Sequence, residues 1–145
     1  MSVQTTFMKN QYMGNAATTV FPYTFDMDKN HPEYIKVYIT TDEGVTTQVT
    51  NFSVNTIQKT VTYPITAGEQ PLASGKKITI TRELPLTQPL NLVNQGPFFA
   101  DDIEQTFDDE TFMIQQIADV QNRVLHIDIA ATDFDTKVPI VAGGV

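Results

Sequence analysis

The sequence predicts a mainly β protein with a C-terminal α-helix, an α+β fold in which a small antiparallel sandwich or barrel precedes one long helix. Two changes in composition near residue 100 indicate this division. Of the 21 threonines, 17 precede residue 100, and β-branched residues favour the pleated surface of a strand. Residues 1–100 are electrically neutral, whereas residues 101–145 carry the whole net charge of −8.

The length of 145 residues suits about one domain, since domains commonly span roughly 100–200 residues. We divide the chain into an N-terminal arm (1–17), an antiparallel β domain (18–99), a helix (100–131) and an extended exit (132–145). No apolar run reaches the length of a membrane helix, and the first ten residues do not form a signal peptide.

The β domain opens with a short aromatic strand at Phe21–Phe25, in which Pro22 favours an edge position or a strand start. The strongest strand is Tyr34–Thr41, whose apolar and polar residues alternate strictly. Asp42, Glu43 and Gly44 then form the loop of a hairpin that returns through Val49, with glycine in the left-handed position.

Three further strands are expected at Asn51–Val54, Thr60–Tyr63 and Lys77–Arg82. Turn residues separate them, as the glycines at 68 and 75 indicate. The segment Leu84–Phe98 contains Pro85, Pro89 and Pro97, which exclude a helix and predict an extended chain.

The helix is predicted over Ala100–Ile127, which lacks proline and glycine and begins with acidic residues at the positive end of the helix dipole. From residue 113 an apolar heptad stripe, which we name the seam, predicts a coiled-coil contact between chains. The seam consists of Met113, Ile117, Val120, Val124 and Ile127. Two heptads leave open the alternative that the helix packs on its own β domain. Phe107, Phe112 and Ile114 lie off the seam, and we expect them to dock on the sheet.

Residues typical of catalytic and metal-binding sites are scarce, so we expect no enzyme activity, no metal and no cofactor. The chain has no cysteine, and His31 and His126 lie far apart without ligands at metal spacing. A calcium-like start at Asp26–Asn30 fails because His31 and Val37 replace the required glycine and glutamate. The acidic run from 101 to 110 is typical of a solvated helix start, and the net negative charge argues against nucleic-acid binding.

Several segments together resemble the N-terminal virion-anchoring domain of tail fibres and tailspikes from short-tailed, podovirus-type bacteriophages. The resemblance rests on Phe21–Phe25, on Ile78–Pro85 followed by Gln88, and on Phe112–Ile117. It implies a homotrimer in the virion tail, made in the host cytoplasm, that attaches to portal, adaptor or nozzle-type tail proteins. Distal fibre or spike domains would follow it, and Val138–Val145 resembles the start of a fibre shaft.

Two functions remain open: a structural anchor, with a free-standing adaptor for a second fibre as its variant, and a carbohydrate-binding or depolymerase-associated domain acting on the host surface. The absence of tryptophan favours the anchor, because sugar sites commonly use aromatic faces. Candidate docking residues come from the aromatic strand and the proline-containing segment, and the alternative for both is packing against the core. They are Phe21, Tyr23, Phe25, Pro85, Gln88 and Pro97.

Overall fold

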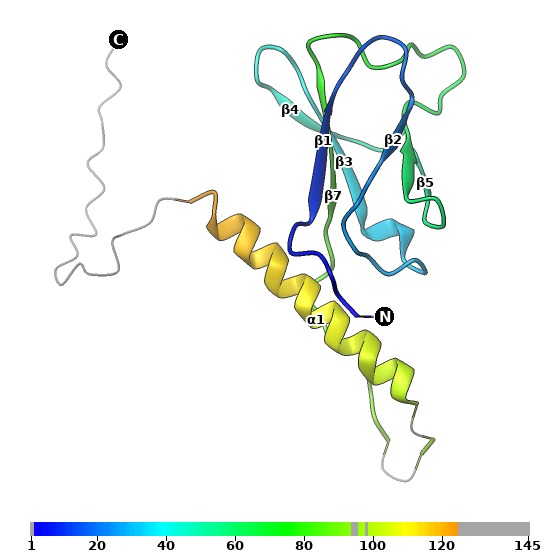
Figure 1. The fold of residues 1–145 in the computed structure, drawn as a ribbon, viewed down its shortest axis with the longest axis vertical. Coiled ribbons are helices and arrows are strands. Elements are labelled where there is room, and N and C mark those ends of the chain that lie inside the picture. The colour runs from blue at the N-terminus through cyan, green and yellow to red at the C-terminus, as the bar shows by residue number, and fades with distance from the viewer. Residues whose placement is uncertain (1, 94–95, 98, 125–145) are drawn as a thin grey trace, which may run out of the picture.

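The computed structural model describes residues 2–93, 96–97 and 99–124, which form two β-sheets and one long helix (Figure 1). The elements are β1 (Lys9–Met13), β2 (Val20–Pro22), a 3₁₀ turn (Pro32–Tyr34), β3 (Ile35–Thr40), β4 (Thr46–Val49), β5 (Ser53–Asn55), β6 (Thr60–Thr62), β7 (Lys77–Arg82) and α1 (Ala100–Gln121). The mainly β fold with a C-terminal helix is therefore confirmed.

The strands form a four-stranded sheet in the order β1-β7-β3-β4 and a three-stranded sheet in the order β2-β6-β5. Every strand pair is antiparallel. The barrel alternative is wrong, because the described strands pair in two separate sheets and do not close on one another.

The core lies between the two sheets and takes side chains from both. In β3 the buried residues Ile35, Val37 and Ile39 alternate with partly exposed ones, as their spacing predicts. Ile78 and Ile80 of the neighbouring β7 are fully buried, and Val61 enters the same cluster from β6. Gly44 closes the β3–β4 hairpin with φ = +86°, the left-handed conformation expected for it.

The aromatic strand is part of this core. Phe21, Tyr23 and Phe25 are each at most 2% exposed, and the Tyr23 and Phe25 rings stack with centroids 5.1 Å apart. Their side chains are therefore not an exposed docking surface, and the alternative of packing against the core describes them. The reason is that alternate side chains of this extended segment face the core, while the intervening Pro22 and Thr24 are exposed.

β1 lies in the N-terminal arm, where no strand was predicted, and extends the larger sheet. It pairs with β7 along its whole length, from Lys9 opposite Thr81 to Met13 opposite Lys77. Gly14 follows it, and a Cβ on this residue would come within 2.2 Å of the Ala73 carbonyl oxygen. The close approach of the two backbones accounts for a glycine at this position.

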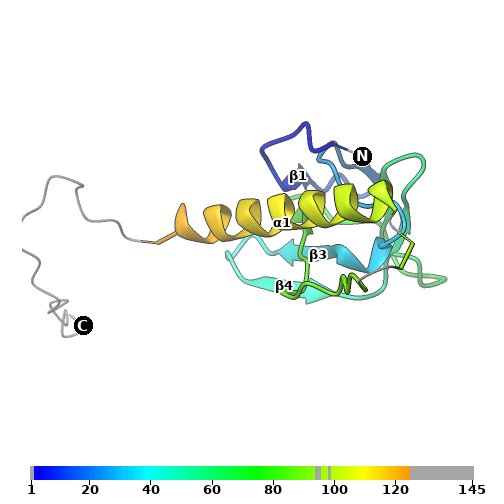
Figure 2. The same cartoon turned by 90° about the horizontal axis from the view of Figure 1, so that it is seen from below.

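Helix α1 runs obliquely past the end of the larger sheet, and its last turns extend beyond the strands (Figures 1 and 2). The preceding segment from Leu84 contains no helix among its described residues, as its prolines predict. The described helix ends at Gln121, so Ile127 and the predicted exit lie outside the described residues. No helix in the described part of the chain is long and apolar enough to cross a membrane.

Candidate functional site: an exposed helix face beside a sheet groove

The helix is attached to the β domain by one side, and Phe112 is the centre of that contact. Its side chain is fully buried, and the Arg82 guanidinium carbon lies 3.8 Å from the centroid of its ring. Arg82 also donates hydrogen bonds to the backbone oxygen of Asp26 and, over 2.6 Å, to Gln115 Oε1. Burial lowers the pKa of Arg82 to about 10, which leaves the guanidinium charged at neutral pH. A desolvated cation over an aromatic face contributes roughly 2 kcal/mol.

Two neighbouring glutamines complete the attachment through the backbone. Gln116 accepts a hydrogen bond from the Leu84 amide at 2.8 Å and donates one to the Leu84 carbonyl at 3.2 Å. Gln115 donates to the carbonyl of Thr5 in the N-terminal arm at 2.7 Å. Because these bonds are directional, they fix the rotation of the helix about its own axis as well as its position.

This rotation turns the seam to one side of the attached face of the helix. Ile117, Val120 and Val124 are each at least half exposed, and Met113 is half-buried. The seam is therefore not the surface by which α1 packs on its own domain.

Of the three residues expected to dock on the sheet, only Phe112 does so. Phe107 and Ile114 are 63% and 67% exposed, so the prediction for these two is wrong. The docked face contains Asp108, Phe112, Gln115, Gln116 and Asp119 at helical spacing. Polar residues with specific partners occupy the positions that the apolar residues were expected to take.

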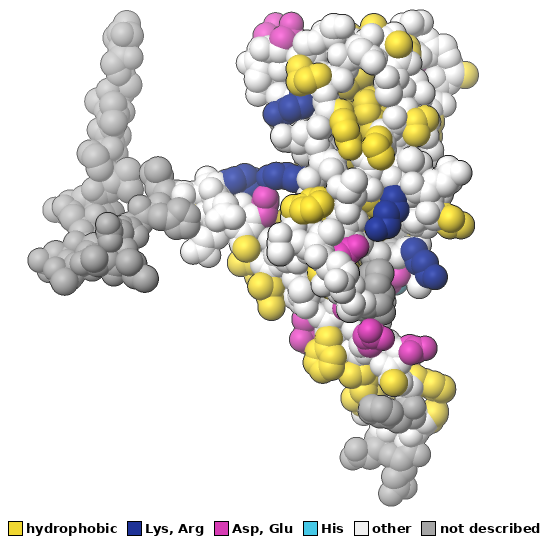
Figure 3. All heavy atoms as spheres, in the orientation of Figure 1, with side chains coloured by type: hydrophobic (Ala, Val, Ile, Leu, Met, Phe, Trp, Pro, Cys, Tyr) yellow, Lys and Arg dark blue, Asp and Glu magenta, His cyan; other side chains and the backbone are white. Residues whose placement is uncertain are grey.

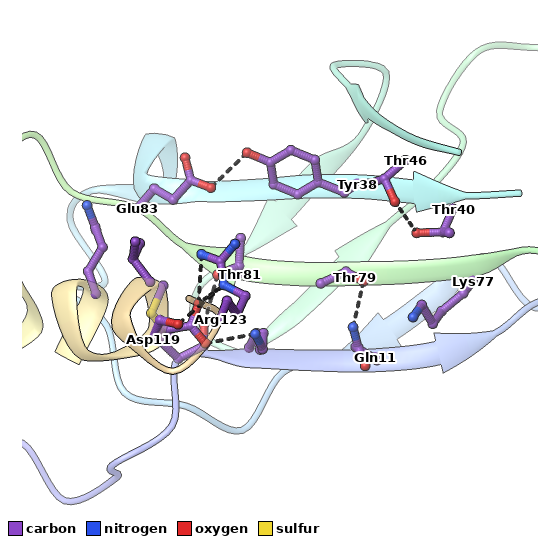
Figure 4. A pocket seen from close by; sticks show the side chains of 14 residues that line it. Gln11, Tyr38, Thr40, Thr46, Lys77, Thr79, Thr81, Glu83, Asp119 and Arg123 are labelled. Atoms are coloured by element: carbon purple, nitrogen blue, oxygen red, sulfur yellow. Dashed lines mark hydrogen bonds and ion pairs between the residues drawn. The ribbon is translucent and has the colours of Figure 1, made fainter. Parts of the chain in front are cut away.

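A groove of about 650 Å³ lies between the last turns of α1 and the outer face of the four-stranded sheet (Figure 4). Its strand side is lined mainly by threonine, glutamine and lysine together with Tyr38, and its helix side includes Val120. Tyr38 donates a 2.7 Å hydrogen bond to Glu83 Oε1, and burial followed by this carboxylate raises the Tyr38 pKa to about 12.

Two of the cations in the groove, Lys9 and Arg123, pair with the same carboxylate, that of Asp119. Asp119 Oδ1 forms an ion pair with Lys9 Nζ at 2.7 Å, and Asp119 Oδ2 forms one with Arg123 Nη2 at 3.1 Å. Hydrogen bonds also join Gln11 to Thr79 and Thr40 to Thr46 across adjacent strands (Figure 4). This arrangement offers a polar binding surface whose side chains are already held in place.

A second group of charges lies where the β2–β3 connection meets the first half of α1. His31 Nδ1 is 2.6 Å from Glu33 Oε1 and its Nε2 is 3.7 Å from Asp28 Oδ2. The hydrogen bond with Glu33, aided by the charges of Asp28 and Asp109, raises the His31 pKa. Burial raises the pKa of Asp109. No group of three metal-ligating side chains occurs within the described residues, and His126 lies outside them.

The described candidate residues of the proline-containing segment are exposed, so the alternative of packing against the core does not describe them. Pro85, Gln88 and Pro97 all lie at the surface. Large exposed apolar side chains accompany them at Leu86, Leu92, Val93 and Phe99. Figure 3 shows apolar side chains at the end of the molecule where α1 begins. We name this set of seven residues the tip surface.

No protein-family model matches the chain. A search of curated proteins finds a "Tail spike protein" of Salmonella phage epsilon15, 40% identical over 123 residues. The match covers 81% of this chain and 11% of that protein. The chain is related to the phage tailspikes.

This relationship is consistent with the N-terminal domain of a podovirus tailspike. The described chain corresponds to about a tenth of its tailspike relative, so most of that relative has no counterpart in these residues. Sequence reasoning did not find the attachment of α1 through Arg82, Gln115 and Gln116. The signal was available, because residues 108, 112, 115, 116 and 119 share one helical face.

Proposed function

We propose that this chain is a structural component of a phage tail, the domain that anchors a tailspike or fibre to the virion. The observation that carries the proposal is the 40% identity to a tail spike protein over most of this chain. The ion pairs of Asp119 with Lys9 and Arg123 in the groove support a binding role without catalysis. The chain would then act by position and contact, with no enzymatic activity and no cofactor.

The anchor assembles as a homotrimer through the seam. The exposed seam supports this, because three helices that meet along it would remove its large apolar side chains from water. Three linked copies also raise the effective concentration of each tail contact, so moderate contacts give a durable joint.

The tip surface is the part of the domain that contacts the tail protein. This proposal is supported by the large exposed apolar residues that gather on an extended backbone containing several prolines. Exposed apolar patches commonly mark protein interfaces. The first hundred residues are neutral, so long-range charge steering contributes little to this contact.

The test is assembly onto phage particles that lack their spikes. The isolated protein should bind these particles and compete with intact spikes for the same positions. It should not adsorb to host cells or release reducing sugar from their polysaccharides. Adsorption or sugar release without particle binding would contradict the anchor and favour a domain acting on the host surface.

A further inference from the structure

The three faces of α1 can be placed around its axis, because successive helical residues turn by about 100°. We take the buried Phe112 as the reference for the side attached to the β domain. Measured from Phe112 by rotation about the helix axis, the centre of the seam then lies at about 110°. Ile114 lies at about 200°, and Phe107 lies close to the same angle. The helix therefore has two exposed apolar sides, and the seam accounts for only one of them.

The angle between the attached side and the seam determines where the β domain lies in an assembly. If the seams meet on a common axis, each β domain stands beside its helix, roughly along the tangent of the ring. Gln115 and Gln116 hold this angle, since their hydrogen bonds fix the helix on the β domain. Each β domain thereby leans towards one neighbouring copy.

The groove lies on the side of α1 that faces this neighbouring copy in the proposed trimer. Val120 belongs to both the seam and the groove lining, and Gln116 also lines the groove. A helix that contacts the seam at Val120 thus lies at the mouth of the groove. In a three-fold ring, this second helix turns one of its sides towards the β domain of the first copy. That side lies about 200° from the side by which the second helix is attached to its own β domain, and it therefore carries Ile114.

We propose that the groove is the seat for the α1 helix of a neighbouring copy, with Ile114 packed against the outer face of the four-stranded sheet. This inference rests on the proposed trimer and adds a second contact to it. The methyl groups of the groove threonines, the Tyr38 ring and Met8 supply apolar surface for Ile114. The contact would fix how the three β domains stand around the helical axis.

The test is cross-linking between two differently marked chains, which the absence of native cysteine makes specific. One chain carries Ile114→Cys and an affinity tag, and the other carries Gln11→Cys without a tag. Both residues are exposed in the single chain, so the substitutions preserve folding. The control replaces the second chain by an Ile57→Cys variant, whose site is 91% exposed on the β5–β6 turn. Each pair is co-expressed and treated with a short bismaleimide.

We expect the Ile114–Gln11 pair to give a covalent tagged–untagged product in high yield, because neighbouring sites within an assembly share an effective concentration of about millimolar. The Ile57 control should give only background. Trimers by light scattering with no cross-linking above that background would overturn the groove contact and leave the proposed trimer standing. Monomers by light scattering would overturn both.

Discussion

Phe112 and Arg82 are the residues through which helix and sheet depend on each other most directly. The ring is fully buried and lies under the guanidinium, so the loss of either side chain disturbs the other. We predict that Phe112→Ala lowers the free energy of unfolding by about 3–5 kcal/mol, the usual cost of emptying a buried aromatic site. Urea unfolding followed by circular dichroism measures it.

Phe99→Ala is the matched control for this substitution, since Phe99 is 59% exposed at the N-terminal boundary of the same helix. Its effect should stay below about 1 kcal/mol. Equal effects of the two substitutions would show that Phe112 is not the centre of the contact.

His31 should make the stability depend on pH. Its pKa in the folded protein is raised, chiefly by the hydrogen bond with Glu33, and Asp28 and Asp109 act in the same direction while Tyr34 stacks on its ring. The stabilisation is complete below the unfolded value of about 6.5 and is lost as pH rises through the raised folded pKa. The stability difference between the native protein and His31→Gln should therefore be larger at about pH 5.5 than at about pH 8.5. A difference that does not change with pH would contradict this role.

At the scale of elements, Gln116 joins α1 to the chain that follows β7. Gln116→Ala leaves the amide and carbonyl of Leu84 without this partner, which costs about 1–3 kcal/mol for buried groups. We expect lower stability and faster hydrogen exchange of the Leu84 amide. Gln121→Ala, at an exposed position of the same helix, should change neither quantity. Unchanged exchange in Gln116→Ala would show that the amide pair does not hold the helix.

The elements differ in how far the sequence predicts them. The alternation in Tyr34–Thr41 and Lys77–Arg82 predicts β3 and β7 because one face of each strand is buried in the core. β1 has the mixed sequence Lys-Asn-Gln-Tyr-Met at a sheet edge, so no alternation marks it. Its place depends on pairing with β7, which is distant in sequence.

The faces of α1 show a second limit of sequence reasoning. Periodicity identifies apolar sides of a helix but does not say which element covers them, and so Phe107 and Ile114 were assigned to the wrong surface. The attached side depends on Arg82 and two glutamines, whose partners are known only from the fold. For the proline-containing segment the sequence predicts an extended backbone, because of its prolines, but does not decide whether its side chains pack against the core or lie at the surface.

For the whole molecule, the proposed trimer depends on the seam. Ile117→Asp together with Val124→Asp should convert the proposed trimer to monomers, because each would bury an unpaired charge among apolar side chains. Helicity should be retained, since both positions are exposed in the single chain. Light scattering and circular dichroism measure the two quantities.

Thr111→Asp is the control for these substitutions, because it adds the same charge at an exposed position outside the seam. The control protein should remain trimeric. If the double variant keeps the mass of the native protein, the seam does not join the chains.

The most direct test of the anchor is a cryo-EM reconstruction of tails that carry this domain. The account predicts three copies around a common helical axis, with the tip surfaces against the tail protein and each groove occupied by a neighbouring helix. Copies placed at the distal end of the spike, with their tip surfaces away from the tail, would contradict it.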